Sequence, residues 1–204
     1  MLRLPPLLAA NYRLATTREV HSWSFGLVKA ARRPGANGWE QRLGTLDDER
    51  IFGPVRDLEC TCGTYRGPAH RGMICDRCGV KVATPEERRR RFGHIDLPVP
   101  LPHPWGDEAE LVGTVPVLPA AFLESPAGVG LARSFEGLLE AAACGSRGEL
   151  RAGLELLVDG LLPAVVFAHE WGLVESPVLA RGLVLEGRGE PAEPGAAPDR
   201  GGIS

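Results

Sequence analysis

The sequence predicts an α+β fold, in which a small cysteine-rich ribbon is set into a loop-rich body and followed by a helical segment. Three observations support this. The 204 residues are 44% hydrophobic, enough to form a core, but include 26 glycines, 18 prolines and only 6% aromatic residues, a composition typical of many loops. Four of the five cysteines fall in two close pairs within residues 60–78. Apolar residues recur at helical spacing within residues 150–161.

The two cysteine pairs predict a metal site. Cys60 and Cys62 are separated by one residue, Cys75 and Cys78 by two, and twelve residues lie between the pairs. Four thiolates complete the tetrahedral coordination of Zn²⁺ and leave no position for water, so we expect one structural zinc ion. Two disulfides, or four unrelated buried thiols, are the alternatives; this spacing in a cytosolic chain favours the metal.

The residues around the cysteines predict the local backbone. Gly63 and Gly79 follow the second cysteine of each pair, where a turn often needs the positive φ that glycine adopts without strain. The spacer of residues 63–74 is long enough to run out and return as a short hairpin, with Gly67-Pro68 as its turn signal. The expected product is a zinc ribbon.

Five short segments carry a resemblance to a known family. They are VHSWSFGLVK at residues 20–29, ERIFGP at 49–54, CDRCGV at 75–80, RFGHIDL at 91–97 and HPW at 103–105. In combination and in this order, they resemble the amino-terminal zinc-binding and clamp region of the bacterial DNA-directed RNA polymerase beta-prime subunit. The resemblance covers residues 20–105, about half of the chain, and implies a shortened or paralogous form with a clamp-like body around the ribbon.

The resemblance implies a role in transcription without a catalytic centre in this chain. The beta-prime subunit holds catalytic Mg²⁺ on an Asn-Ala-Asp-Phe-Asp-Gly-Asp segment, and this sequence contains no such segment. Nucleotidyl transfer needs clustered carboxylates that hold two metal ions about 4 Å apart, so we expect no catalytic residues here, although the chain would be part of a nucleotidyltransferase. The expected partners are RNA polymerase subunits or another transcription protein, and the backbone of DNA or RNA.

A second hypothesis is a free-standing, non-catalytic zinc-ribbon module that binds a protein or nucleic acid outside any polymerase. Co-purification with polymerase subunits separates the two hypotheses, because only the first requires it. A degenerate fragment that folds around zinc without retained activity is a third possibility.

Charge is distributed unevenly along the chain. Residues 1–94 contain 17 Lys and Arg against 10 Asp and Glu, and the remainder contains 6 against 16, for a net charge of −3. Positive charge on a rigid ribbon favours a polyanion, so nucleic acid is the expected partner of the first half. Solvation of the arginine run without any partner is the alternative. The candidates for phosphate contact are Arg66, Arg71, Arg77, Lys81, Arg88, Arg89, Arg90 and Arg91.

Local patterns predict further elements. Residues 22–25 alternate polar and aromatic side chains, which suits a half-buried strand or the start of a packed loop. Thr84-Pro85 begins a helix that carries the arginine run, and residues 95–105 indicate a strand or a polyproline-like crossing. His94 and His103 are not expected to bind metal, because the four cysteines already satisfy the zinc ion.

The second half of the chain predicts a helix and a flexible end. Ser146 and Glu149 form a capping box, and Pro163 is expected to end the helix. Cys144 is expected to be a small buried residue, residues 176–185 a closing strand, and the residues beyond 186 disordered. The apolar stripe of the helix, expected to face a core, consists of Leu150, Leu154, Leu157, Val158 and Leu161.

These patterns divide the chain into four predicted segments. No apolar run approaches the roughly eighteen residues of a membrane span, and the apolar start is short and broken by two prolines, so we expect a cytoplasmic protein. The segments are an N-terminal clamp-like segment (1–55), a zinc ribbon with a basic helix (56–94), proline-punctuated strands and helices (95–185), and a disordered tail (186–204).

Overall fold

A three-stranded sheet lies at the centre of the structure, a computed structural model that describes residues 12–13, 16–31, 38–104, 111–126, 128–170 and 185–186. The strands are β2 (Ser24–Leu27), β3 (Phe92–Pro102) and β4 (Leu111–Val117), in the order β2-β3-β4. β2 runs parallel to β3, and β4 runs antiparallel to β3. β3 confirms the strand that was predicted after residue 95.

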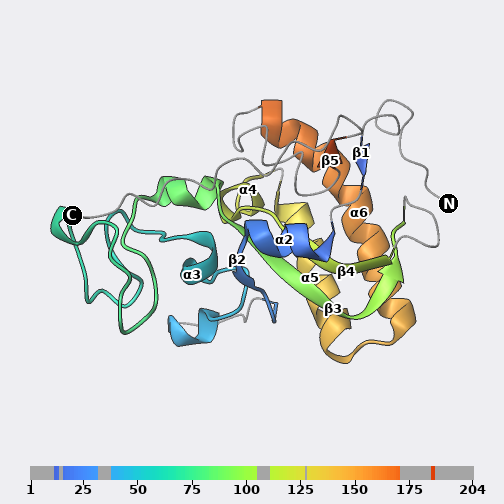
Figure 1. Ribbon diagram of the computed structural model, residues 1–204, viewed down its shortest axis with the longest axis horizontal. Coiled ribbons are helices and arrows are strands. Elements are labelled where there is room, and N and C mark those ends of the chain that lie inside the picture. Colours follow the sequence, from blue (N-terminus) through green and yellow to red (C-terminus); the bar gives the residue numbers. More distant parts are fainter. Residues whose placement is uncertain are drawn as a thin grey trace.

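Helices lie on both sides of this sheet. In Figure 1, α2 (Thr17–Trp23) crosses in front of the strands and α5 (Val129–Cys144) lies behind them. α6 (Arg147–Glu170) packs along α5. The mixed α+β class is therefore confirmed. The shorter elements are α3 (Glu49–Phe52), α4 (Ala120–Leu123), the 3₁₀ turns η1 (Glu40–Arg42), η2 (Pro68–His70) and η3 (Pro85–Arg89), and the antiparallel pair β1 (Tyr12–Arg13) and β5 (Leu185–Glu186).

β3 separates two environments. Ile95 and Leu97 are buried in the main core, whereas His94 and Asp96 point to the opposite face, where both contact α2. This alternation follows from the two-residue period of a strand. Thr114 of β4 is the cross-strand neighbour of Asp96, so its hydroxyl lies on the same face and donates a 2.8 Å hydrogen bond to the carboxylate.

The main core lies between the sheet, α3 and the two long helices. Four of the five residues in the predicted apolar stripe of α6 are buried there, which confirms that this stripe faces a core. The side chain of the fifth, Leu161, lies outside the described part of the structure. The largest fully buried side chains of the main core include Phe52, Phe122, Phe135, Leu138, Leu154 and Leu157.

The start of α6 was predicted correctly and its end was not. The Glu149 carboxylate accepts a hydrogen bond from the Ser146 backbone N–H at 2.6 Å, and the Ser146 hydroxyl accepts one from the Glu149 N–H at 3.3 Å. These two bonds confirm the capping box. The predicted stop at Pro163 is wrong, because the helix continues to Glu170. Proline inside a helix costs about 3 kcal/mol, and packing of α6 along α5 offsets that cost.

Residues 22–25 were predicted as a half-buried strand or the start of a packed loop, and only Ser24 and Phe25 lie in a strand. Ser22 and Trp23 end α2, and β2 begins at Ser24. A capping box starts α2: Thr16 Oγ1 accepts from the Glu19 N–H at 3.3 Å, and the Glu19 carboxylate accepts from the Thr16 N–H at 2.8 Å. These caps favour a helix that continues through the alternating residues.

The predicted basic helix is a short 3₁₀ turn. Thr84 occupies the N-cap position with extended backbone angles and Pro85 follows as the first residue, as predicted, but the Thr84 side chain makes no capping bond. The turn ends at Arg89 because β3 begins three residues later, at Phe92. The four arginines therefore do not share one regular helix.

Some predictions lie outside the described residues: the tail beyond residue 186, the strand at 176–184, the burial of Cys144 and the crossing at Trp105. The segment boundaries stay a prediction, as do the zinc ribbon and the clamp-like body. None of the described helices combines the length and apolar character needed to span a membrane.

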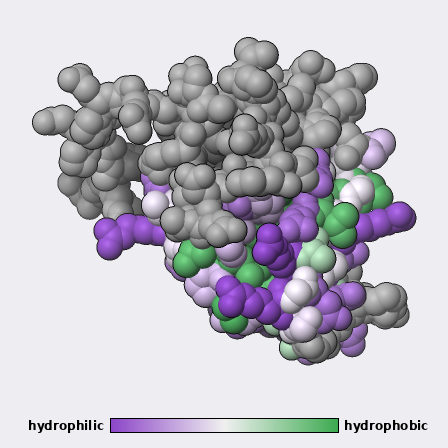
Figure 2. All heavy atoms as spheres, turned by 90° about the vertical axis from the view of Figure 1, so that its right-hand side faces the viewer, coloured by the Kyte–Doolittle hydropathy of each residue, from purple (hydrophilic) through white to green (hydrophobic). Residues whose placement is uncertain are grey.

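On the face drawn in Figure 2, apolar side chains of the described residues are scattered. Figure 2 shows the side that lies at the right of Figure 1, where the described residues mix hydrophilic side chains with small groups of apolar ones. Scattered apolar residues are normal on protein surfaces. Leu156 of α6, for example, is 67% exposed, whereas Leu154 is 1% exposed.

We expect Leu154→Ala to lower the free energy of unfolding by about 2–5 kcal/mol, because it leaves a cavity in the main core. Leu156→Ala, the same change two residues away on the exposed side, should alter it by less than about 0.5 kcal/mol. Urea unfolding followed by circular dichroism measures both. Equal effects would contradict the assigned orientation of α6.

Candidate metal centre

Two tight turns present the four cysteines. In the first turn, the Gly63 N–H donates to the Cys60 carbonyl at 2.9 Å, and in the second the Gly79 N–H donates to the Cys75 carbonyl at 2.8 Å. Gly63 and Gly79 have φ angles of 77° and 72°. The predicted positive φ values are thus confirmed, and a side chain at either position would be strained.

Isolated antiparallel bridges close both turns. They pair Glu59 with Arg66 around the first cysteine pair and Ile74 with Lys81 around the second. The predicted turn after Gly67 is present as η2. The bridges therefore enclose the cysteine pairs, whereas the prediction placed a hairpin in the spacer between them.

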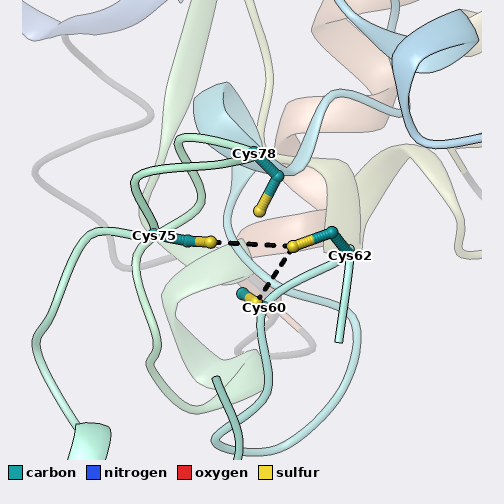
Figure 3. Close-up of side chains that lie close together, drawn as sticks. All are labelled: Cys60, Cys62, Cys75 and Cys78. Atoms are coloured by element: carbon teal, nitrogen blue, oxygen red, sulfur yellow. Dashed lines mark hydrogen bonds between the residues drawn. The ribbon is translucent and has the colours of Figure 1, made fainter. Parts of the chain in front are cut away.

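The four sulfurs converge on one point, as Figure 3 shows. Cys62 Sγ lies 3.6 Å from both Cys60 Sγ and Cys75 Sγ, and all four Sγ atoms, including that of Cys78, lie within 4.8 Å of one another. A disulfide has a sulfur–sulfur distance of about 2.05 Å, and all four are free cysteines. A tetrahedral ion with metal–sulfur bonds of about 2.3 Å places its sulfurs about 3.8 Å apart. The observed spacing fits such an ion.

Burial and hydrogen bonding act differently on these thiols. Burial raises the pKa of Cys60, and it raises the pKa of Cys78 to about 12. At the partly exposed Cys62, burial also acts to raise the pKa, but hydrogen bonds from the Thr64 hydroxyl and backbone outweigh it and lower the pKa to about 6. The Tyr65 N–H donates to Cys60 Sγ at 3.3 Å, which helps to stabilise a thiolate there.

The cluster is suited to a cation. Cys60, Cys75 and Cys78 are at most 3% exposed, so several thiolates could coexist at this spacing only with a positive charge between them. A bound divalent metal ion supplies that charge and displaces the thiol protons.

A small apolar cluster surrounds the sulfurs. Val80 and Val82 are fully buried against the cysteines, and Leu58, Tyr65 and Trp39 pack against them partly buried. This cluster is separate from the main core. The candidate metal centre therefore has its own packing, and Trp39 and a set of polar contacts connect it to the rest of the protein.

The central polar contact comes from the residue between the first two cysteines. The Thr61 hydroxyl donates to the Glu49 carboxylate at 2.6 Å and accepts from Arg42 Nη2 at 3.0 Å. Glu49 is 6% exposed; it also lies 3.4 Å from Arg42 Nη1 and accepts from the Val55 N–H at 3.1 Å. This network joins the first cysteine turn to α3. It was not predicted from the sequence, because no local pattern pairs Thr61 with a residue twelve positions earlier.

The predicted phosphate-contact residues lie in different environments. Lys81 is half-buried, and Arg66 pairs with Glu59 at 3.2 Å. Phosphate contact by any of the eight predicted residues stays a prediction. The exposed members are Arg66, Arg71, Arg77, Arg89 and Arg90.

Two members of the arginine run are buried and hold the body together. Arg88 is 5% exposed and donates to the Gly53 carbonyl at 2.9 Å, and it forms a short ion pair with Glu124 of the segment after α4. Arg91 is 4% exposed, binds Glu87 at 2.7 Å, and lies 4.8 Å from the centre of the Phe25 ring. Both side chains are buried and contact other parts of the protein, and neither is exposed to solvent as a phosphate-binding side chain would be.

Two histidines that could suggest metal ligation lie in the body. His103 is 8% exposed, and burial lowers its pKa to about 4. His94 lies on the side of β3 that faces α2, and burial lowers its pKa as well. Among the described residues, the group around the converging sulfurs consists of the four cysteines alone.

The amino-acid sequence of this chain is similar to those of known proteins. A stretch of 103 residues, 50% of the chain, is 44% identical to "DNA-directed RNA polymerase subunit beta'" of Rhodopirellula baltica. The same subunit of Lactobacillus helveticus is 45% identical over 92 residues, and that of Thermosipho africanus is 37% identical over 129 residues, 62% of the chain.

About half of this chain is homologous to the RNA polymerase beta-prime subunit. The resemblance drawn from the motifs is thus confirmed. The chain spans only 7–8% of the length of these relatives. No protein-family model matches the chain.

We expect Thr61→Val to lower the free energy of unfolding by about 1–3 kcal/mol, because it leaves the buried Glu49 carboxylate without its closest donor. Thr61→Ser keeps the hydroxyl and should restore most of the stability. Urea unfolding of the metal-loaded chain measures both variants. A Thr61→Val variant as stable as the wild type would show that the network does not hold the cysteine turn to α3.

Proposed function

We propose that this chain is a beta-prime-like component of a DNA-directed RNA polymerase and contributes a zinc-stabilised piece of its clamp. The observation that carries the proposal is the convergence of four cysteine sulfurs inside a region that is 37–45% identical to beta-prime subunits. In this proposal, residues 1–55 form the clamp-like segment and residues 56–94 the zinc ribbon. Residues 95–185 form the following strands and helices, and residues 186–204 the tail.

The metal in this proposal is a single structural Zn²⁺ bound by Cys60, Cys62, Cys75 and Cys78. Four thiolates complete its coordination, so it would supply folding free energy and no open position for catalysis. The sulfur–sulfur distances of 3.6 Å support this ligand set. The thiolate-rich donor set favours zinc over Mg²⁺ or Ca²⁺, which prefer oxygen ligands.

Nucleic-acid contact is the second part of the proposal. Exposed arginines lie close to the cysteine turns, among them Arg71 and Arg77, and residues 1–94 carry more Lys and Arg than Asp and Glu. Such a surface attracts phosphates without reading bases. Arg88 and Arg91 contribute instead through ion pairs within the body, with Glu124 and Glu87.

Catalysis is assigned to another chain in this proposal. The sequence contains no Asn-Ala-Asp-Phe-Asp-Gly-Asp segment, which the beta-prime subunit uses to hold Mg²⁺. The chain would act through contacts with other polymerase subunits and with DNA or RNA, in the cytoplasm. The free-standing zinc-ribbon module is not favoured, because the similarity to beta-prime subunits reaches beyond the cysteines to 92–129 residues.

A tagged pull-down from the native cell, with metal measured on the same eluate after a wash with a weak chelator, tests the polymerase role. We expect other polymerase subunits and about one zinc ion per chain. Cys75→Ser should lose the zinc and most of the subunits, because the ribbon loses its structure, whereas Cys144→Ser, in α5, should keep both. Zinc without polymerase subunits in the wild-type eluate would support the free-standing module instead.

The salt dependence of DNA binding tests the nucleic-acid contact. We expect Arg71→Gln with Arg77→Gln to lower the slope of log Kobs against log salt concentration by about 0.9 for each phosphate that is no longer neutralised, about 1.8 for the pair. Fluorescence anisotropy with a duplex DNA measures it. Arg133→Gln with Arg151→Gln makes the same change of charge on exposed positions of α5 and α6 and should leave the slope unaltered. Equal slopes in all three proteins would mean that the ribbon arginines are only solvated.

A further inference from the structure

A second group of metal-ligating side chains lies on the sheet, outside the cysteine cluster. His21 at the end of α2 and His94 and Asp96 of β3 place their ligand atoms within 4.8 Å of one another. The His21 and His94 rings lie with their centres 4.5 Å apart. The Asp96 carboxylate lies between their nitrogens: Oδ1 is 3.0 Å from His21 Nε2, and Oδ2 is 3.7 Å from His94 Nε2.

The hydrogen bonds of Ser24 fix the orientation of His94. The Ser24 hydroxyl donates its only proton to the Gly26 carbonyl at 3.0 Å. When it donates in this way, it accepts from His94 Nδ1, which lies 2.7 Å away. In that arrangement the neutral His94 ring carries its proton on Nδ1, and Nε2, which lies 3.7 Å from Asp96 Oδ2, has a free lone pair. In this tautomer Nε2 is available to bind a cation beside the Asp96 carboxylate.

Asp96 is also held in place by a second residue. The Thr114 hydroxyl, directly across the sheet, donates to Asp96 Oδ1 at 2.8 Å. Outer hydrogen bonds of this kind, to a histidine nitrogen and to a carboxylate oxygen, are the ones that orient ligands in protein metal sites. Ser24 and Thr114 therefore prepare two of the three candidate ligands before any ion binds.

The distances also fit an ion. Ligand atoms around a tetrahedral Zn²⁺, with bonds of about 2.0–2.1 Å, lie about 3.3 Å from one another. The separations of 3.0 Å and 3.7 Å lie on either side of that value. Two imidazoles and one carboxylate are a donor set that suits zinc and its neighbours among the divalent transition metals better than Mg²⁺ or Ca²⁺.

We propose that His21, His94 and Asp96 bind a divalent transition-metal ion of the zinc class, at a site separate from the cysteine cluster. His94 binds through Nε2, and His21 binds through Nε2 after the ion replaces the proton that this nitrogen shares with Asp96. Three protein ligands leave at least one coordination position for water or for an external ligand. The ion joins the end of α2 to β3, and the site does not depend on the proposed role in a polymerase.

Calorimetric titration of the 204-residue chain with Zn²⁺ tests this site. The chain first receives one zinc equivalent for the cysteines, and the excess is removed with a weak chelator. We expect one further equivalent to bind the wild type, and His21→Gln and Asp96→Asn each to weaken this step by more than about tenfold. Both side chains are nearly half exposed, at 46% and 45%, so both variants should fold.

Three further variants separate ligand binding from general structure. Ser24→Ala should weaken the second equivalent by about 10–100-fold without changing its stoichiometry, because it removes the outer partner of His94. His70→Gln and Asp57→Asn make the same chemical changes outside the site and should leave the second equivalent unaltered. The absence of a second equivalent in the wild type, or its undiminished binding in both His21→Gln and Asp96→Asn, would overturn the proposal. Loss of the first equivalent in Cys75→Ser, with the second retained, would identify the two sites as independent.

Discussion

The convergence of four sulfurs on one point is the interaction on which residues 58–83 depend. Within this fully described segment, regular structure is limited to isolated bridges and the single turn η2, and the apolar cluster around the sulfurs is small. A core of this size cannot offset the entropy of ordering so many residues. The free energy of binding a metal ion, about 10–16 kcal/mol in zinc-finger peptides at neutral pH, is large enough to do so.

The segment of residues 58–83 is joined to the rest of the protein by a buried charge network as well as by the chain itself. Glu49 and Arg42 form hydrogen bonds with Thr61 of this segment, whereas Arg88 contacts Gly53 and Glu124 within the body. Arg88 and Arg91 are both buried, while the two arginines between them are exposed. One short run of like charges therefore supplies both internal ion pairs and exposed positive charge.

Sequence reasoning was most successful where structure is decided by near neighbours. Three correct predictions rest on residues within a few positions of one another. They are the close spacing within each pair of candidate metal-binding cysteines, the positive φ of Gly63 and Gly79, and the capping box of α6. The continuation of α6 through residue 163 and the contact of Thr61 with Glu49 depend on tertiary packing. The grouping of His21 with His94 and Asp96 depends on how α2 packs against β3. No local sequence pattern predicts this packing.

The parallel pairing of β2 with β3 places the whole cysteine segment inside one crossover connection, residues 28–91. Closing a long flexible loop before its ends can pair is entropically unfavourable, and this slows the folding of sheets with distant partners. If residues 58–83 order first around a bound metal ion, the free length of chain between the two strands becomes much shorter. Metal supply would then influence the rate at which the central sheet assembles, in addition to the stability of that segment.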